Sequence, residues 1–77
     1  MTRAYVLIES SVGKTRDIVK ALKSAGGIKQ VDMVTGPFDI IAIVEANDLN
    51  SVGDLITSNI HSVAGIVRTT TCLAVMV

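Results

Sequence analysis

Residues 34–44 read VTGPFDIIAIV, and this stretch decides how the chain folds back on itself. Gly36-Pro37 is a turn signal, because glycine tolerates positive φ while proline fixes φ and lacks an amide donor. The residues on either side, 28–35 and 40–45, are rich in strand formers and predict a hairpin. Asp39 then places a carboxylate against a strand that is apolar throughout, and this charge requires an explanation.

Outward from the hairpin, the apolar pattern predicts two more strands and two helices. Residues 4–8 and 66–77 are rich in strand-forming residues and predict the first and last strands. Gly26-Gly27 ends the first helix, and Asn47-Asp48 caps the second. The apolar stripes that define these helices are Ile18, Leu22 and Ala25 in the first, and Leu49, Val52, Leu55 and Ile56 in the second.

The order β-α-β-β-α-β predicts an α+β, ferredoxin-like fold, in which a four-stranded antiparallel sheet has both helices on one face. The other face should then be polar in a monomer. Residues 40–44 are nevertheless apolar on both sides, and both alternating sets of residues 66–77 end apolar. We therefore expect two copies to dimerise sheet to sheet.

The composition supports association. The 77 residues form a single domain, which is marginally stable alone, yet 49% are hydrophobic and only 18% are charged. One cysteine allows no intrachain disulfide, and a single histidine excludes a Cys/His zinc cluster. We expect no cofactor, and we expect apolar surface to be covered by further copies of the chain.

Seven basic and seven acidic residues give a net charge of zero, without a basic cluster along the chain. We therefore expect no direct DNA binding. The longest apolar run, residues 72–77, is far too short to span a membrane, and the N-terminus lacks the layout of a signal peptide. These features predict a cytoplasmic protein with no membrane partner.

Several residues resemble catalytic or phosphate-binding groups, but the neighbouring sequence does not favour these functions. Gly13-Lys14-Thr15 resembles the end of a phosphate-binding loop, but Ile8 stands where that motif needs its first glycine. His61 is interpreted as a surface histidine, and Cys72 as a small apolar filler within a strand. A Cys72–His61 nucleophile pair is the less favoured alternative.

Thr69 and Thr71 share one face of the last predicted strand, and that face is otherwise valine and leucine. Hydroxyls in an apolar wall need partners from protein, water or a ligand. Together with Asp39, they suit a zwitterion: hydroxyls and turn amides for a carboxylate, Asp39 for an ammonium, and apolar walls for a side chain. Aspartate also caps turns by accepting from backbone amides, so both roles remain open for Asp39.

The residues VTGPFD at 34–39 and GIVRTTT at 65–71, in this topology, resemble the RAM domain. This domain is the effector-binding, C-terminal half of the Lrp/AsnC transcription regulators, and the resemblance covers essentially all 77 residues. It implies amino-acid effectors, sheet-to-sheet dimers, and octamer-like rings of dimers with the effector at the junction between dimers. The ligand-binding residues that it implies are Val34, Gly36, Pro37, Phe38, Asp39, Thr69 and Thr71.

The resemblance has two departures. Pro37 removes an amide from the turn that would hold the ligand, and the first strand starts too early for the helix-turn-helix domain of the regulators. We therefore expect residues 1–77 to form a stand-alone sensor that is not an enzyme and that co-assembles with full-length regulators. The alternatives are a small dimeric ferredoxin-like enzyme, of the monooxygenase or isomerase type with Tyr5 or His61 as its catalytic candidates, and an ACT-like regulatory domain.

Overall fold

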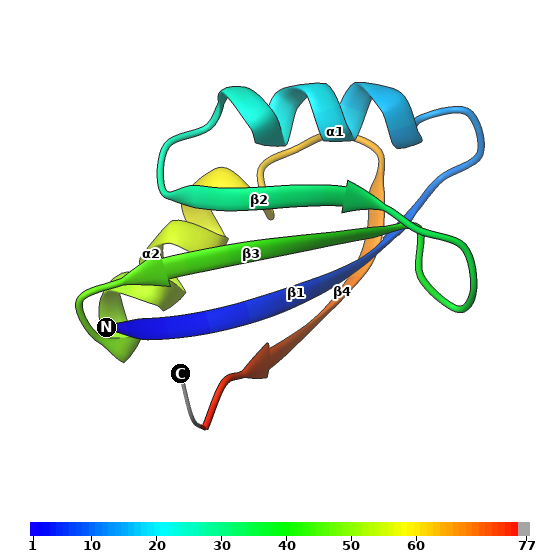
Figure 1. Ribbon diagram of the computed structural model, residues 1–77. Coiled ribbons are helices and arrows are strands. Elements are labelled where there is room, and N and C mark those ends of the chain that lie inside the picture. Colours follow the sequence, from blue (N-terminus) through cyan, green and yellow to red (C-terminus); the bar gives the residue numbers. More distant parts are fainter. Residues whose placement is uncertain (76–77) are drawn as a thin grey trace.

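The computed structural model describes residues 1–75 and confirms the expected order of elements. The sheet has the strand order β2-β3-β1-β4, and every neighbouring pair of strands is antiparallel (Figure 1). The elements are β1 (Thr2–Ser10), α1 (Thr15–Ser24), β2 (Ile28–Met33), β3 (Ile40–Ala46), α2 (Leu49–Asn59) and β4 (Ile66–Leu73).

Alternation along the two central strands places their buried side chains on one face of the sheet. In β1 and β3 every second residue is buried, and those of β1 lie opposite those of β3. Both helices pack onto this face, which we call the closed face, and no polar side chain of residues 1–75 is fully buried there. The core consists of Ala4, Val6, Ile8, Ile18, Leu22, Ile40, Ala42, Val44, Val52, Ile56 and Ile60.

Two strands end earlier than the sequence predicts. β2 stops at Met33 rather than Thr35, because the Val34 N–H bonds to the Asp39 carbonyl at 2.9 Å and closes the hairpin loop. β4 stops at Leu73, which lies opposite Ala4 near the start of β1. β4 is an edge strand that pairs with β1, and just beyond its last residue the Ala74 N–H still donates to the Arg3 carbonyl at 2.9 Å. The predicted extension over residues 76 and 77 lies outside the described residues.

The helices are placed unequally over the sheet. α1 packs over β2 and β3, whereas α2 packs over β3 and β1, so the helix side of β4 lies beside α2 rather than beneath it. Gly65 allows the chain to enter β4 close to α1: its φ is +97°, and a Cβ there would approach the Lys14 Cβ to 2.9 Å. The edge strand β4 therefore borders an uncovered strip of the closed face.

Candidate ligand-binding site

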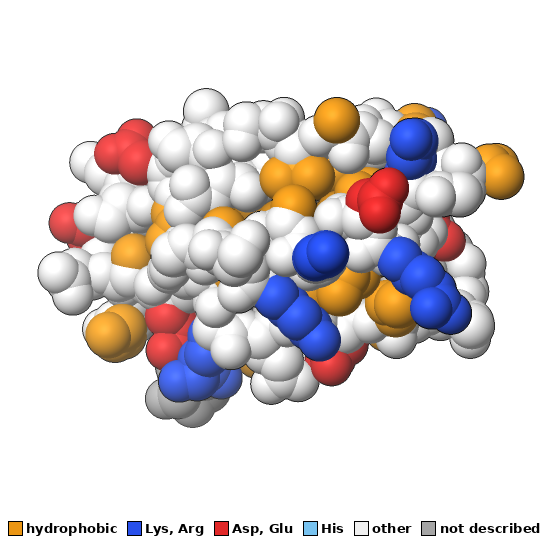
Figure 2. All heavy atoms as spheres, turned by 90° about the horizontal axis from the view of Figure 1, so that it is seen from above, with side chains coloured by type: hydrophobic (Ala, Val, Ile, Leu, Met, Phe, Trp, Pro, Cys, Tyr) orange, Lys and Arg blue, Asp and Glu red, His pale blue; other side chains and the backbone are white. Residues whose placement is uncertain are grey.

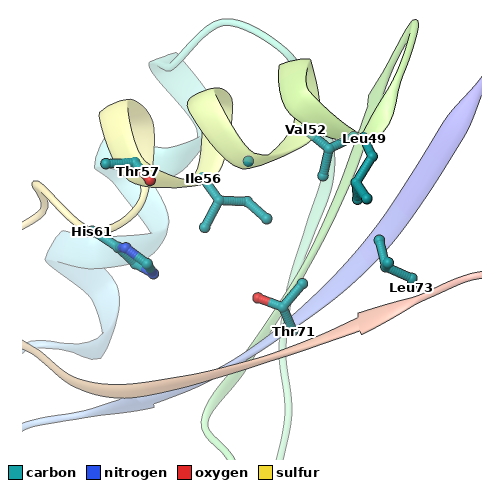
Figure 3. A pocket seen from close by; sticks show the side chains of 8 residues that line it. Leu49, Val52, Ile56, Thr57, His61, Thr71 and Leu73 are labelled. Carbon is teal, nitrogen blue, oxygen red and sulfur yellow. The ribbon is translucent and has the colours of Figure 1, made fainter.

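A cavity of about 340 Å³ lies in this strip, between α2 and β4. Val52 and Ile56 of α2 form its wall toward the core, and both are buried. The partly exposed side chains of Leu49 and Leu73 stand at one end (Figure 3). Leu49 was predicted to belong to the apolar stripe of α2; it is 57% exposed because it faces the cavity rather than the core. The complete lining is Leu49, Val52, Gly53, Ile56, Thr57, His61, Thr71 and Leu73.

The opposite end of the cavity is polar. Thr57 and His61 lie there, on the side away from the two leucines, and Thr71 projects from β4 between the two ends (Figure 3). The turn after α2 positions His61, because its N–H bonds to the Ile56 carbonyl at 2.9 Å. The ring Nε2 lies 3.2 Å from the Thr69 hydroxyl. The cavity thus pairs an apolar body with a hydrogen-bonding end, as sites for small amphipathic molecules do.

The Asp39 carboxylate is engaged within the chain. Its Oδ2 accepts from the Ser10 N–H at 2.8 Å and from the Ser10 hydroxyl at 3.2 Å. The backbone N–H of Asp39 bonds to the Ile8 carbonyl at 2.9 Å, so the residue joins the hairpin to β1. Ser10 lies beside a bulge in the β1–β4 pairing, where an amide needs another acceptor. The Asp39 carboxylate therefore serves as the acceptor for Ser10 at the edge of the hairpin. Its Oδ1 receives no hydrogen bond from residues 1–75.

The structure separates the predicted site residues into two groups. Thr71 lines the cavity and Thr69 bonds to His61, whereas Val34, Gly36, Pro37, Phe38 and Asp39 lie on or beside the hairpin loop. Within one chain the hairpin does not line the cavity. The groups nevertheless lie toward the same end of the sheet, because Ile8 pairs with Thr69 on one side and with Ile40, the neighbour of Asp39, on the other.

Of the eight residues that line the cavity, sequence reasoning predicted only Thr71 as a site residue. His61 is exposed, as a surface histidine should be, but its place beside Thr69 follows only from the packing of the turn after α2. Gly53 also lines the cavity, in the middle of α2. The signal in the sequence was a glycine inside a predicted amphipathic helix. Glycine there lowers helix stability by about 1 kcal/mol relative to alanine, so its presence indicates a packing or functional role.

The other chemical candidates do not converge. Cys72 pairs with Tyr5 in the β1–β4 ladder, and both alternate to the face opposite the buried Val6 and its partner Thr71. His61 lies on the closed face, so neither Cys72 nor Tyr5 shares a site with it. Cys72 is exposed, which makes its interpretation as an apolar filler wrong for the single chain. Among residues 1–75 no cluster of three or more potential metal ligands is present.

Basic side chains are concentrated on α1 and at its start. Four of the seven basic residues lie exposed on this helix or at its start, with Asp17 among them (Figure 2). They are Lys14, Arg16, Lys20 and Lys23. The helical period places Arg16, Lys20 and Lys23 on one face, whereas Lys14 precedes the first residue of α1, and none of the four lines the α2–β4 cavity. Neither described helix has the length and apolar character needed to span a membrane.

Fold and site together define the class: a ferredoxin-like domain with a ligand-sized, partly apolar cavity at one edge of its sheet. Comparison with family models then identifies it. The model described as the Lrp/AsnC ligand binding domain matches residues 3–76, and the chain belongs to this family. This confirms the resemblance carried by the hairpin and the last strand. A search of curated proteins returned no match.

Solved structures agree with this assignment. The protein TTHA0845 from Thermus thermophilus is 32% identical, with a TM-score of 0.92 over 100% of this chain and 96% of that one. FFRP-DM1 is 29% identical, with a TM-score of 0.90 over 97% of this chain and 100% of that one. A longer protein, the transcriptional regulator NMB0573 from Neisseria meningitidis in complex with L-Met, shares the fold at 12% identity. Its TM-score is 0.85 over 97% of this chain and 50% of the regulator.

Proposed function

We propose that this protein is an amino-acid sensor and assembly module, which binds an amino acid and acts in the regulation of transcription or amino-acid metabolism. The observation that carries the proposal is the match of the Lrp/AsnC ligand binding domain to nearly the whole chain. The protein performs no catalysis in this proposal, because its task is to couple binding to assembly.

The chemistry of the cavity supports an amino acid as ligand. Its lining contains no aspartate, glutamate, lysine or arginine, and it changes from leucines at one end to hydroxyl and imidazole groups at the other. A ligand with its side chain among the leucines would direct its charged groups toward Thr69 and the hairpin end of the sheet. The L-Met complex of the Neisseria meningitidis regulator is a precedent for the ligand class in a protein of the same fold.

In this proposal the contacts to the ligand that the cavity of one chain lacks are provided by neighbouring copies in the assembly. Two copies dimerise through the sheet face opposite the helices, and dimers join into an octamer-like ring. There the hairpin of a neighbouring copy contributes the contacts inferred for Val34, Gly36, Pro37, Phe38 and Asp39. The module is cytoplasmic and co-assembles with full-length regulators without binding DNA itself, so a low-salt gel shift of the pure protein should show no shifted band.

Calorimetric titration with each of the twenty amino acids tests the function. We expect one amino acid, or a small group with apolar side chains, to bind with a saturable heat signal. Ultracentrifugation of the same samples should show a species well above the 8.1 kDa of one chain. The absence of binding by all twenty, with the protein folded and assembled, would reject the sensor function.

Asp39→Asn separates ligand binding from turn capping. Asparagine retains an oxygen that accepts from Ser10 but loses the charge offered to a ligand ammonium. We expect folding and assembly to persist and binding to weaken by about 1–3 kcal/mol, the usual scale for a hydrogen bond to a charged group. Asp17→Asn, which neutralises an exposed carboxylate on α1, is the matched control. If Asp39→Asn and wild type bind the amino acid with equal affinity, the role of Asp39 is limited to its hydrogen bond with Ser10.

Thr71→Val tests the cavity wall in the same titration. Valine has nearly the shape of threonine and forms strands well, so β4 should be retained. We expect weaker amino-acid binding because a hydroxyl that faces the cavity is lost. Thr70→Val, one residue away on the opposite face of β4, should bind as wild type does.

A further inference from the structure

Gly53 has no role that the fold of a single chain explains. It lies in the middle of α2, where glycine is less favourable than any residue except proline. Its φ is not positive, unlike those of Gly13, Gly27, Gly36 and Gly65, so the backbone does not require a glycine. A Cβ built at position 53 meets no atom within 4 Å, so packing does not require one either.

The space that glycine leaves at this position opens into the α2–β4 cavity. Gly53 belongs to the cavity lining together with Val52 and Ile56, its neighbours on α2. A larger side chain there would occupy part of the 340 Å³ and would cover the helix backbone. Glycine inside a regular element often marks a close approach by a ligand or another backbone. Contact between a ligand or another backbone and α2 at Gly53 would offset the helix stability that glycine loses.

We propose that Gly53 is a specificity-determining residue, which lets the apolar side chain of a bound amino acid lie directly against the backbone of α2. This inference rests on the proposed function and adds to it the part of the site that limits ligand size. The bare surface at Gly53 admits a long or branched side chain, and the leucines at positions 49 and 73 enclose its end.

The ligand class follows from the lining. A cavity of about 150 Å³ already admits a molecule of the size of benzene, so the present volume accommodates the largest aliphatic side chains. At the end formed by Leu49 and Leu73 no carboxylate, ammonium or guanidinium group lines the cavity, so a charged ligand side chain there would lose hydration without a partner. The class is thus amino acids with a large apolar side chain, among them leucine, isoleucine and methionine, and charged side chains are disfavoured.

Graded substitution at Gly53 tests this size limit. Gly53→Ala should raise the melting temperature by about 4–8 °C, since alanine favours the helix. Its affinity should fall about tenfold for leucine, isoleucine and methionine, and less for alanine as ligand. Gly53→Leu fills the cavity and should reduce binding of the large aliphatic amino acids at least a hundredfold, as measured by calorimetry on the intact, assembled protein.

Ser58→Ala and Ser58→Leu are the matched controls, because Ser58 is an exposed position of α2 that does not line the cavity. Both should keep the wild-type affinity.

The titrations distinguish a failure of the proposed function from a failure of this inference. If wild type binds no amino acid, the proposed function fails and this inference fails with it.

If wild type binds but Gly53→Leu binds equally well, the inference alone is overturned. Ultracentrifugation of the same variants covers the remaining alternative, in which a second copy of the chain fills the cavity. In that case Gly53→Leu would lower the assembled mass, whereas the proposal predicts an unchanged mass. A reduced mass would therefore also overturn the assignment of this cavity to the ligand.

Discussion

Ile40 and Ile41 are identical neighbours in β3, yet they lie on opposite faces of the sheet. Ile40 faces the helices and is 0% exposed, whereas Ile41 faces away from them and is half-buried. The same division runs through the sheet. The closed face is completed within one chain by two helices, and the opposite face, which we call the open face, has no covering element among residues 1–75.

The open face is nevertheless not an ordinary polar surface. Its centre is apolar and half-buried, and it consists of Tyr5, Leu7, Ile41 and Ile43. Charged pairs lie toward its ends: Arg3 with Glu45 at one end, and Glu9 with Arg68 at the other. An apolar centre within a charged rim is the usual anatomy of a protein interface. One face thus stabilises the single chain, whereas the other has the composition of an interface and is left uncovered among residues 1–75.

The largest expected effect is on the closed face. Ile40→Ala leaves a cavity in a fully buried core and should lower the free energy of unfolding by about 2–5 kcal/mol. Ile41→Ala should cost only about 1 kcal/mol in dilute, monomeric protein, because its side chain is partly hydrated already. Urea denaturation measures both. If Ile40→Ala does not fold, Ile40→Val should still cost about 0.5–1.5 kcal/mol. Equal losses for the alanine variants would remove the distinction between the faces.

A second experiment tests whether the open face is an interface. Ile41→Lys places an ammonium at its apolar centre, where a sheet-to-sheet partner would have to desolvate it. We expect the sedimenting mass to fall toward 8.1 kDa while circular dichroism shows the same fold. Val12→Lys, at a fully exposed loop residue, is the control and should retain the assembled mass. An unchanged mass for Ile41→Lys would mean that the copies associate through another surface.

The helix layer of the closed face provides a smaller, pH-dependent effect. The Ser51 N–H donates to the Asp48 carboxylate at 2.8 Å, and this backbone bond, then the Ser51 hydroxyl, lowers the pKa of Asp48. The stabilisation is complete above the pKa of the unfolded chain and is lost as pH falls through the lower folded-state pKa. Asp48→Ala should lower the melting temperature by about 4–8 °C at neutral pH. In acid the difference from wild type should shrink to the part that a neutral capping oxygen supplies, and Asp48→Asn should retain that part at every pH.

The smallest effect is expected at the rim of the open face. Arg3 donates to the Glu45 carboxylate and, with Lys29 as a further partner, lowers the pKa of Glu45 against the opposing effect of burial. Glu45→Gln should lower the melting temperature by about 1–3 °C at neutral pH in low salt. The difference should vanish as pH falls through the lowered pKa of Glu45, and it should shrink in high salt. A loss that is insensitive to salt would point to packing rather than charge.

Much of the fold could be predicted because its signals are local. The Gly36-Pro37 turn, the Asp48 cap and the period-2 and period-3.6 patterns each involve residues within a few positions of one another. The ends of the strands were less predictable. Val75 has the side chain of a strand former, but the paired residues of β4 end at Leu73 although β1 begins two residues before Ala4, the partner of Leu73. A strand ends where its ladder ends, and that depends on another segment of the chain.

The candidate site shows the same division more sharply. Because charges and hydroxyls are costly within apolar strands, the residue types alone predict polar partners for Asp39, Thr69 and Thr71. The packing of distant segments sets which partners are met: Asp39 bonds to Ser10, 29 positions away, and Thr69 to His61 across the strip beside α2. It also decided that α2 covers β1 and β3 but not β4, which creates the cavity at Gly53. The physical reason is that a side-chain period specifies which face an element buries, whereas packing sets where that element lies on the sheet.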